Sequence, residues 1–190
     1  MNLEAFIFGL DGVLIESDDC NFKAWKRLAD EMGTAFDRET FQKLDSVSRR
    51  AAAEIIFEDQ DMSEDEIRAA LERQNNLYHD LVLKMSPGDV LPGVLDLLKA
   101  LQSEGIPIGI SSEHKDAEKA VDALGLTPFV DVIGDGYSVK ESMPEPDVLL
   151  YVAHEMGVKP ENCVVVESQS KGIDAANRAG MYAIGIGKSE

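Results

Sequence analysis

The stretch that decides the fold is FIFGLDGVL, residues 6–14. Its apolar run has the length of a strand and breaks at Gly9, where the turn Gly9-Leu10-Asp11-Gly12 begins. Such a run is typical of a buried strand in a parallel sheet, and open α/β sheets bind their ligands just beyond the ends of such strands. The turn is therefore a candidate site, although its first residue is a glycine and its carboxylate is that of Asp11.

After a helical block, the rest of the chain alternates between amphipathic segments with helical periodicity and short apolar runs. The runs lie at 106–110, 129–133, 163–167 and 182–187. This alternation predicts an α/β fold, with a parallel, Rossmann-like sheet, right-handed crossovers and helices on both faces.

The helical block begins near residue 18, ends near residue 85, and contains no convincing strand. Within it, Ser63 and Glu66 have the spacing of a capping box before an apolar helical stripe. We therefore expect an all-α cap domain at 16–87, inserted into a core domain made of 1–15 and 88–190.

The chain of 190 residues carries 18 basic and 36 acidic residues, a formal net charge of −18. This excess of negative charge argues against nucleic acid or an anionic membrane surface as a partner. The two cysteines, Cys20 and Cys163, make neither a disulfide framework nor a zinc motif, and Cys163 is expected to be a buried apolar residue. No signal peptide and no stretch of membrane-spanning length is present, so we expect a cytoplasmic protein.

Several motifs occur in one order along almost the whole chain: LDGVL, NFKAWKRLADEMG, VSR, SPGDVLPGVLDLLKAL, IGISS, MPEPD, VVVES, GIDAANRAGM and AIGIG. In this order the chain resembles the haloacid dehalogenase superfamily, and within it the β-phosphoglucomutase-like branch of sugar-phosphate mutases and phosphatases. The resemblance implies phosphoryl transfer through an aspartyl-phosphate, with Mg²⁺ as cofactor and a helical cap that closes over the substrate.

The catalytic positions implied by this resemblance are only partly retained. Gly9 occupies the position of the nucleophilic aspartate, and Asp11 that of the acid/base aspartate, whose carbonyl also binds the metal. Glu167 matches the first acid of the metal-binding pair, but Ser168 replaces the second. Asp11 beside Gly12 is also what a tight turn prefers, so its retention has a structural explanation as well.

Of the phosphate-binding positions that the resemblance implies, some are likewise retained and others are replaced. Ser112 matches the serine that binds the phosphoryl group, and Arg49 keeps the position that contacts substrate phosphate in the mutases. Met143 stands where the family has a lysine. Cap positions that carry histidine or lysine in relatives also differ, and here they are Asn21, Asp45 and Gln74.

Three interpretations follow. The chain is a pseudoenzyme with weak or absent Mg²⁺ binding, or an enzyme with altered machinery, or a scaffold for interactions. In the second case, Asp11 or Glu167 acts as a base, or Lys140 replaces the missing lysine. The partner is a small phosphorylated metabolite or a protein, and the chain is a monomer or homodimer. In each case we expect Gly9, Ser112, Met143 and Glu167 to converge on one cleft.

Overall fold

A computed structural model describes residues 3–44, 47–112, 117–136, 138, 139, 141 and 143–187. The chain divides into two compact units, an α/β unit made of Met1–Glu16 with Met85–Glu190 and a helical unit made of Ser17–Lys84. The limits expected from the sequence, 1–15 with 88–190 and 16–87, differ from these by one to three residues.

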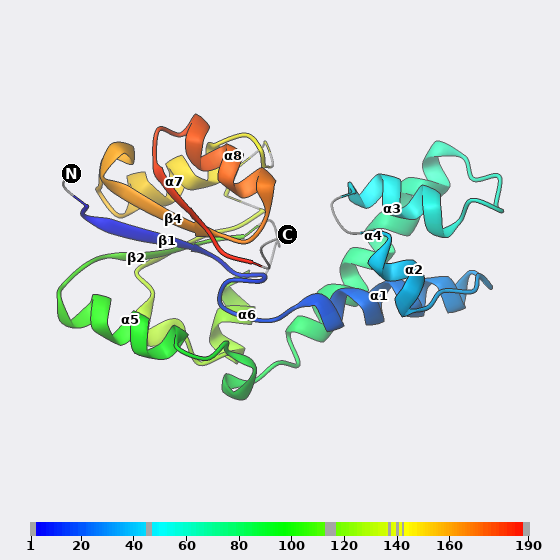
Figure 1. Ribbon diagram of the computed structural model, residues 1–190, viewed down its shortest axis with the longest axis horizontal. Coiled ribbons are helices and arrows are strands. Elements are labelled where there is room, and N and C mark those ends of the chain that lie inside the picture. The colour runs from blue at the N-terminus through cyan, green and yellow to red at the C-terminus, as the bar shows by residue number, and fades with distance from the viewer. Residues whose placement is uncertain are drawn as a thin grey trace. The chain divides into compact units, whose positions relative to one another are not determined.

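The α/β unit contains a five-stranded parallel sheet (Figure 1). Its strands are β1 (Ala5–Gly9), β2 (Ile108–Ser111), β3 (Val132–Gly134), β4 (Cys163–Glu167) and β5 (Tyr182–Gly185). The spatial order is β3-β2-β1-β4-β5, which places β1 at the centre. The predicted parallel α/β sheet is confirmed, and apart from Glu167 at the end of β4 the residues of β1 and β4 are apolar because both faces of these strands are buried.

Helices cover both faces of this sheet, as predicted (Figure 1). They are α5 (Val94–Ser103), α6 (Ala117–Ala123), α7 (Asp147–Glu155) and α8 (Ser170–Arg178). The helices α7 and α8 pack on one face, where Ile7 and Val165 of the strands join Val152 and Ala176 of the helices in one apolar cluster. The helix α5 lies on the opposite face.

The helical unit consists of α1 (Asp18–Glu31), α2 (Arg38–Gln42), α3 (Arg49–Ile56) and α4 (Glu64–Val82). The predicted capping box is present, because Ser63 Oγ accepts a hydrogen bond from the Glu66 N–H while the Glu66 carboxylate accepts one from the Ser63 N–H. No helix in the part of the chain that the structure describes is long and apolar enough to span a bilayer.

The two chain segments that lead into and out of the helical unit are joined inside the α/β unit. Ile15 forms an antiparallel bridge with Val90, and the Leu91 N–H donates a hydrogen bond of 2.9 Å to the Leu14 carbonyl. A short 3₁₀ turn, η1 (Pro87–Asp89), directly precedes this contact. Both ends of the insertion are thus fastened to each other within the α/β unit.

Candidate active site

The carboxyl ends of three neighbouring strands lie side by side. Gly9 ends β1, its register partner Ser111 ends β2, and Glu167 ends the adjacent strand β4. Ser112 lies one residue beyond Ser111, and its N–H donates a hydrogen bond of 2.9 Å to the Gly134 carbonyl at the end of β3. The topology therefore brings the strand-end motifs to one edge of the sheet, as open α/β folds do.

The Glu167 side chain fills the space beside Gly9. It is only 7% exposed, and its Oε2 accepts hydrogen bonds from the N–H groups of Ser168 (2.9 Å) and Gln169 (3.3 Å). A Cβ atom added at Gly9 would lie 2.8 Å from Glu167 Oε1, and one added at Gly172 would lie 2.6 Å from Glu167 Cγ. The carboxylate is thus held between two glycines and occupies the place where a side chain at residue 9 would begin.

Burial is the main influence on the charge of this carboxyl group. It raises the pKa of Glu167, because the ionised form loses its hydration. The N–H groups of Gln169 and Ser168, and the charge of Lys171, oppose this effect, while the negative charge of Asp11 adds to it. Glu167 therefore holds a proton more readily than an exposed glutamate does.

Ser168 bridges the ends of β4 and β1. Its hydroxyl donates a hydrogen bond of 2.7 Å to the backbone carbonyl of Asp11. The same hydroxyl oxygen lies 2.6 Å from where a Cβ atom at Gly12 would stand, and Gly12 has a φ of +70°. Glycine is thus required at residue 12 for both its backbone conformation and the close approach of Ser168. The Asp11 carbonyl, to which the resemblance gives a metal-binding role, accepts a hydrogen bond from the protein itself.

These donors fall short of a magnesium site. Magnesium requires near-octahedral oxygen coordination, usually with carboxylates in its first shell of ligands. Here Glu167 is packed against Gly9, the Asp11 carbonyl is engaged by Ser168, and a hydroxyl replaces the second acid. Among the residues that the structure describes, no group of three or more His, Cys, Asp or Glu side chains could hold a metal ion.

Met143, at the position of the family lysine, contributes to apolar packing. It is partly buried against the cluster formed by β1, β4, α7 and α8, and it precedes Pro144 in a cis peptide bond. Of the four positions expected to share one cleft, Gly9 and Glu167 lie next to each other and Ser112 follows the neighbouring strand, and the shared cleft itself stays a prediction. For Met143 the structure shows a role in packing. Lys140, considered as its replacement, lies outside the described residues.

The sequence pointed to a role for Ser112 but gave none to Ser111 or Gly172. The Ser111 hydroxyl is buried and has no hydrogen-bond partner among the residues that the structure describes, while Ser112 is also buried. Gly172 lies inside α8, and its lack of a side chain leaves room for Glu167. A glycine within a helical pattern usually has a packing reason, and this signal in KGIDAANRAG could have identified Gly172.

In the helical unit, the predicted phosphate ligand Arg49 is tied to α4. Its guanidinium donates hydrogen bonds to Gln74 Oε1 (2.6 Å), the Leu71 carbonyl (3.0 Å) and Asn75 Oδ1 (3.3 Å). Gln74 is buried, and its amide in turn donates to Asn21 Oδ1 at 3.1 Å. Three cap positions chosen from the resemblance thus form one network within the unit. The fourth, Asp45, lies outside the described part of the chain.

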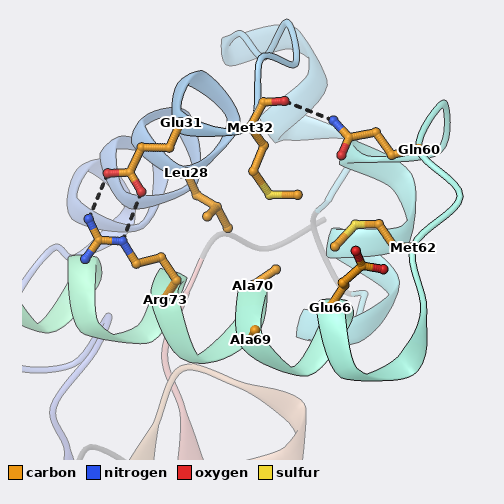
Figure 2. A pocket seen from close by; sticks show the side chains of 9 residues that line it. All are labelled: Leu28, Glu31, Met32, Gln60, Met62, Glu66, Ala69, Ala70 and Arg73. Atoms are coloured by element: carbon orange, nitrogen blue, oxygen red, sulfur yellow. Dashed lines mark hydrogen bonds and ion pairs between the residues drawn. The ribbon is translucent and has the colours of Figure 1, made fainter.

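The helical unit also contains a cavity of about 410 Å³ that no sequence motif predicted (Figure 2). Leu28 of α1 and Met32, the residue that follows α1, face Ala70 of α4 across it. At one rim Arg73 forms a two-pronged ion pair with Glu31, with N···O distances of 2.9 and 2.8 Å. The lining is mainly apolar. The Arg73 guanidinium and the Glu31 carboxylate are largely paired with each other.

The sheet topology and the strand-end residues define the class of open α/β proteins that bind ligands beyond the carboxyl ends of parallel strands. Within that class, the chain belongs to the haloacid dehalogenase-like hydrolase family, whose profile matches residues 3–180. It falls in the phosphoglucomutase/phosphatase branch, which confirms the resemblance seen in the sequence.

Three relatives illustrate the similarity. The chain is 32% identical to the β-phosphoglucomutase of Bacillus subtilis (strain 168), with 99% of this chain and 85% of the relative covered. It is 30% identical to the fructose-1-phosphate phosphatase YqaB of Escherichia coli (strain K12), with 95% and 94% covered. The crystal structure of β-phosphoglucomutase from Clostridium difficile is 35% identical and matches with a TM-score of 0.79, covering 98% of this chain and 85% of that one.

Proposed function

We propose that this chain is a non-catalytic member of the phosphomutase/phosphatase branch, which keeps the fold but not magnesium-dependent phosphoryl transfer. The observation that carries the proposal is the position of Glu167. Its carboxylate fills the space beside Gly9, where the family's nucleophile would begin. Glycine has no side chain to attack phosphorus, so the covalent step cannot start at this residue.

The charge at the strand ends supports the same proposal. A phosphoryl group in transfer needs positive charge or a metal ion to stabilise its oxygens. Met143 supplies no positive charge. The Ser168 hydroxyl donates a hydrogen bond to the Asp11 carbonyl and brings no carboxylate to bind a metal ion. A phosphoryl group approaching this edge would meet Glu167 and Asp11 without a compensating cation from these positions.

The test is a phosphate-release assay with fructose 1-phosphate and with an aryl phosphate, each with and without millimolar Mg²⁺. The unmodified chain and Gly9→Asp are both expected to show no magnesium-dependent turnover, because residues that act as a unit recover little when one is restored. The E. coli fructose-1-phosphate phosphatase serves as the active control. Robust magnesium-dependent turnover by the unmodified chain would overturn the proposal.

Titration calorimetry with Mg²⁺ tests the metal part separately. We expect no heat of binding from the unmodified chain at millimolar Mg²⁺. The variant with both Gly9→Asp and Ser168→Asp regains two carboxylates and is expected to bind more Mg²⁺ than the unmodified chain does. Equal, tight binding by both would show that Glu167 and Asp11 suffice as ligands.

A second candidate function is catalysis with altered machinery, and one observation favours it. The raised pKa of Glu167 is the kind of shift found in general acids and bases at active sites. In that case, metal-independent hydrolysis would be measurable in the same assay and would be lost in Glu167→Gln. Absence of metal-independent turnover in the unmodified chain removes this candidate.

A further inference from the structure

The cavity of the helical unit lies apart from the network that holds Arg49. It is called here the α1/α4 groove, and its volume is about 410 Å³ (Figure 2). Its apolar lining is made of Leu28, Met32, Met62, Ala69 and Ala70. Gln74 and Asn75, which accept hydrogen bonds from Arg49, do not line it. The groove is therefore separate from the position that the resemblance assigns to substrate phosphate.

The apolar part of the groove is open enough to receive side chains from another molecule. Met32 and Met62 are half-buried, and Ala69 of α4 is exposed. Methionine is unbranched and adapts its shape, and apolar grooves rich in it accept the apolar face of an amphipathic segment. A small-molecule site, in contrast, usually encloses most of its ligand. An open groove with two half-buried methionines thus suits a protein segment better than a small molecule.

The charged residues in the lining leave one negative charge uncompensated. Among the described residues that line the groove, Arg73 is the only base, and it pairs with Glu31 at 2.9 and 2.8 Å. Arg27 donates a further hydrogen bond to Glu31, at 3.3 Å. The other lining acid, Glu66, accepts hydrogen bonds from the N–H and hydroxyl of Ser63, and no base in the described part of the chain pairs with it.

The loop that borders the groove adds more negative charge. Residues 57–66, FEDQDMSEDE, contain six carboxylates and no base. Two of the six are paired with arginines of α3 and α4. The loop acids Glu58, Asp59 and Asp61 are exposed, and within the described residues none of them forms an ion pair. They flank Gln60 and Met62, which line the groove. One side of the groove is thus bordered by exposed negative charge.

This combination indicates the chemistry of the occupant. The acidic border would repel the phosphates of nucleic acids and anionic lipids, and a second copy with a net charge of −18 would be repelled as well. A cationic segment would be attracted, and the apolar lining requires that it also carry apolar side chains. We propose that the α1/α4 groove binds a basic amphipathic segment of a partner protein, with its lysines or arginines facing Glu58, Asp59 and Asp61.

The experiment measures binding of a model segment by fluorescence anisotropy. The probe is a short labelled peptide of leucine and lysine, arranged with helical periodicity so that the leucines form one face. Two further peptides serve as controls. One has the same composition in a shuffled order without an apolar face, and the other has glutamate in place of lysine. We expect the complete chain to bind the amphipathic basic peptide about tenfold more tightly than either control peptide.

Two single substitutions locate the binding site. Met62→Lys and Ala69→Lys each place a cation where the apolar side chains of the peptide would lie, so each should raise the dissociation constant about fivefold or more. Leu150→Lys adds the same charge at an exposed leucine of α7 in the α/β unit and should leave the dissociation constant unchanged. Circular dichroism checks that each variant is folded, and two groove variants keep the test independent of either one.

A pair of triple variants tests the role of the acidic border. One triple variant combines Glu58→Gln, Asp59→Asn and Asp61→Asn. The control removes three exposed carboxylates from the α/β unit, with Asp96→Asn, Glu104→Gln and Glu118→Gln. Both lose the same amount of negative charge. The border variant should bind the peptide several-fold more weakly at low salt, with a smaller salt dependence, and the control should stay close to the wild type.

Four outcomes would overturn the proposal. The first is that the amphipathic basic peptide does not bind. The second is equal binding of this peptide and its shuffled form, which would reveal only the general attraction of cations to an acidic protein. The third is wild-type affinity in both Met62→Lys and Ala69→Lys, which would place the peptide elsewhere. The fourth is equal affinity of the two triple variants, which would exclude the acidic border as the feature that selects the partner.

Discussion

The Ser168 hydroxyl donates a hydrogen bond of 2.7 Å to the backbone carbonyl of Asp11, and this bond joins the ends of β4 and β1. A carboxylate at residue 168 would face the same carbonyl as a second acceptor, and the two oxygens would need a cation between them. The hydroxyl of Ser168 is instead a hydrogen-bond donor to this carbonyl. In this structure the hydrogen bond from Ser168 links the two strand ends.

The first prediction concerns this bond. Ser168→Ala should lower the free energy of unfolding by about 1 kcal/mol, because the Asp11 carbonyl loses its donor. Ser168→Asp should lower it further in the presence of EDTA, since a carboxylate then faces the carbonyl beside the close-packed Gly12. Urea unfolding measures both. A Ser168→Ala variant as stable as the wild type would show that water replaces the hydroxyl at no cost.

The second prediction concerns the contact between Gly9 and Glu167. Gly9→Ala should destabilise the fold by about 1–3 kcal/mol, because the new methyl group would lie 2.8 Å from Glu167 Oε1 in a buried site. The same substitution should cost much less in a Glu167→Ala background, with a coupling energy of about 1 kcal/mol or more.

The control for this comparison of Gly9→Ala in the two backgrounds is Gly88→Ala. A Cβ atom at Gly88 would meet its nearest neighbour, Ser86 Oγ, at an ordinary contact distance of 3.6 Å. It should change stability little. Additive effects of Gly9→Ala and Glu167→Ala would mean that the Glu167 side chain moves aside freely.

The third prediction concerns pH. Burial raises the pKa of Glu167 above its ordinary value of 4.5, so the folded state binds this proton more tightly than the unfolded state does. Its contribution to stability is fully present below the unfolded pKa and is lost as the pH rises from about 4.5 through the folded pKa. Glu167→Gln should remove this part of the pH dependence.

Urea unfolding at several pH values measures this difference between the wild type and Glu167→Gln. Glu104→Gln, which changes an exposed carboxylate at the end of α5, should follow the wild-type pH profile. Parallel profiles for the wild type and Glu167→Gln would contradict the prediction.

The fourth prediction concerns the thiols. Cys163 is fully buried, and burial raises its pKa to about 11. At a pH near 8, only about one thiol in a thousand would be ionised at this residue. Iodoacetamide should therefore alkylate the partly exposed Cys20 first and reach Cys163 only after denaturation. Peptide mass spectrometry locates the label, and rapid native labelling of Cys163 would indicate that the β4 end opens readily.

The fifth prediction concerns Arg49. Arg49→Lys keeps the charge but cannot contact the three α4 oxygens in the same geometry, so it should destabilise the chain by about 1 kcal/mol. Arg68→Lys is the control, since Arg68 only pairs with Asp65 on the exposed surface, and it should have little effect. Equal stability of the two variants would show that the Arg49 network contributes nothing to the fold.

The alternation of apolar runs and helical segments was sufficient to predict the parallel sheet. Strands such as CVVVE are buried on both faces and are therefore apolar up to the final glutamate, and Ser63 with Glu66 marked the start of α4 at the right residue. The resemblance also predicts which catalytic side chains are missing, because each motif position is filled by a residue whose type can be read from the sequence.

Which side chain occupies the space beside Gly9 could not be predicted from residue types alone. The place of Glu167 between Gly9 and Gly172 depends on the approach of β1, β4 and α8, which are far apart along the chain. The hydrogen bond from Ser168 to Asp11 joins residues 157 positions apart. The resemblance predicts that Met143 replaces a lysine, but its packing against the apolar cluster is a property of the folded chain.

The bridge between Ile15 and Val90 makes the segment 17–84 resemble a removable cassette. Because the segments that enter and leave it are fastened to each other within the α/β unit, the ends that a replacement must join are already neighbours. A short linker, or a helical segment of different length and sequence, could be spliced between them without altering the order of the sheet. The helical unit is thus an exchangeable part, and the α/β unit has the connections to fold around whatever segment is inserted there.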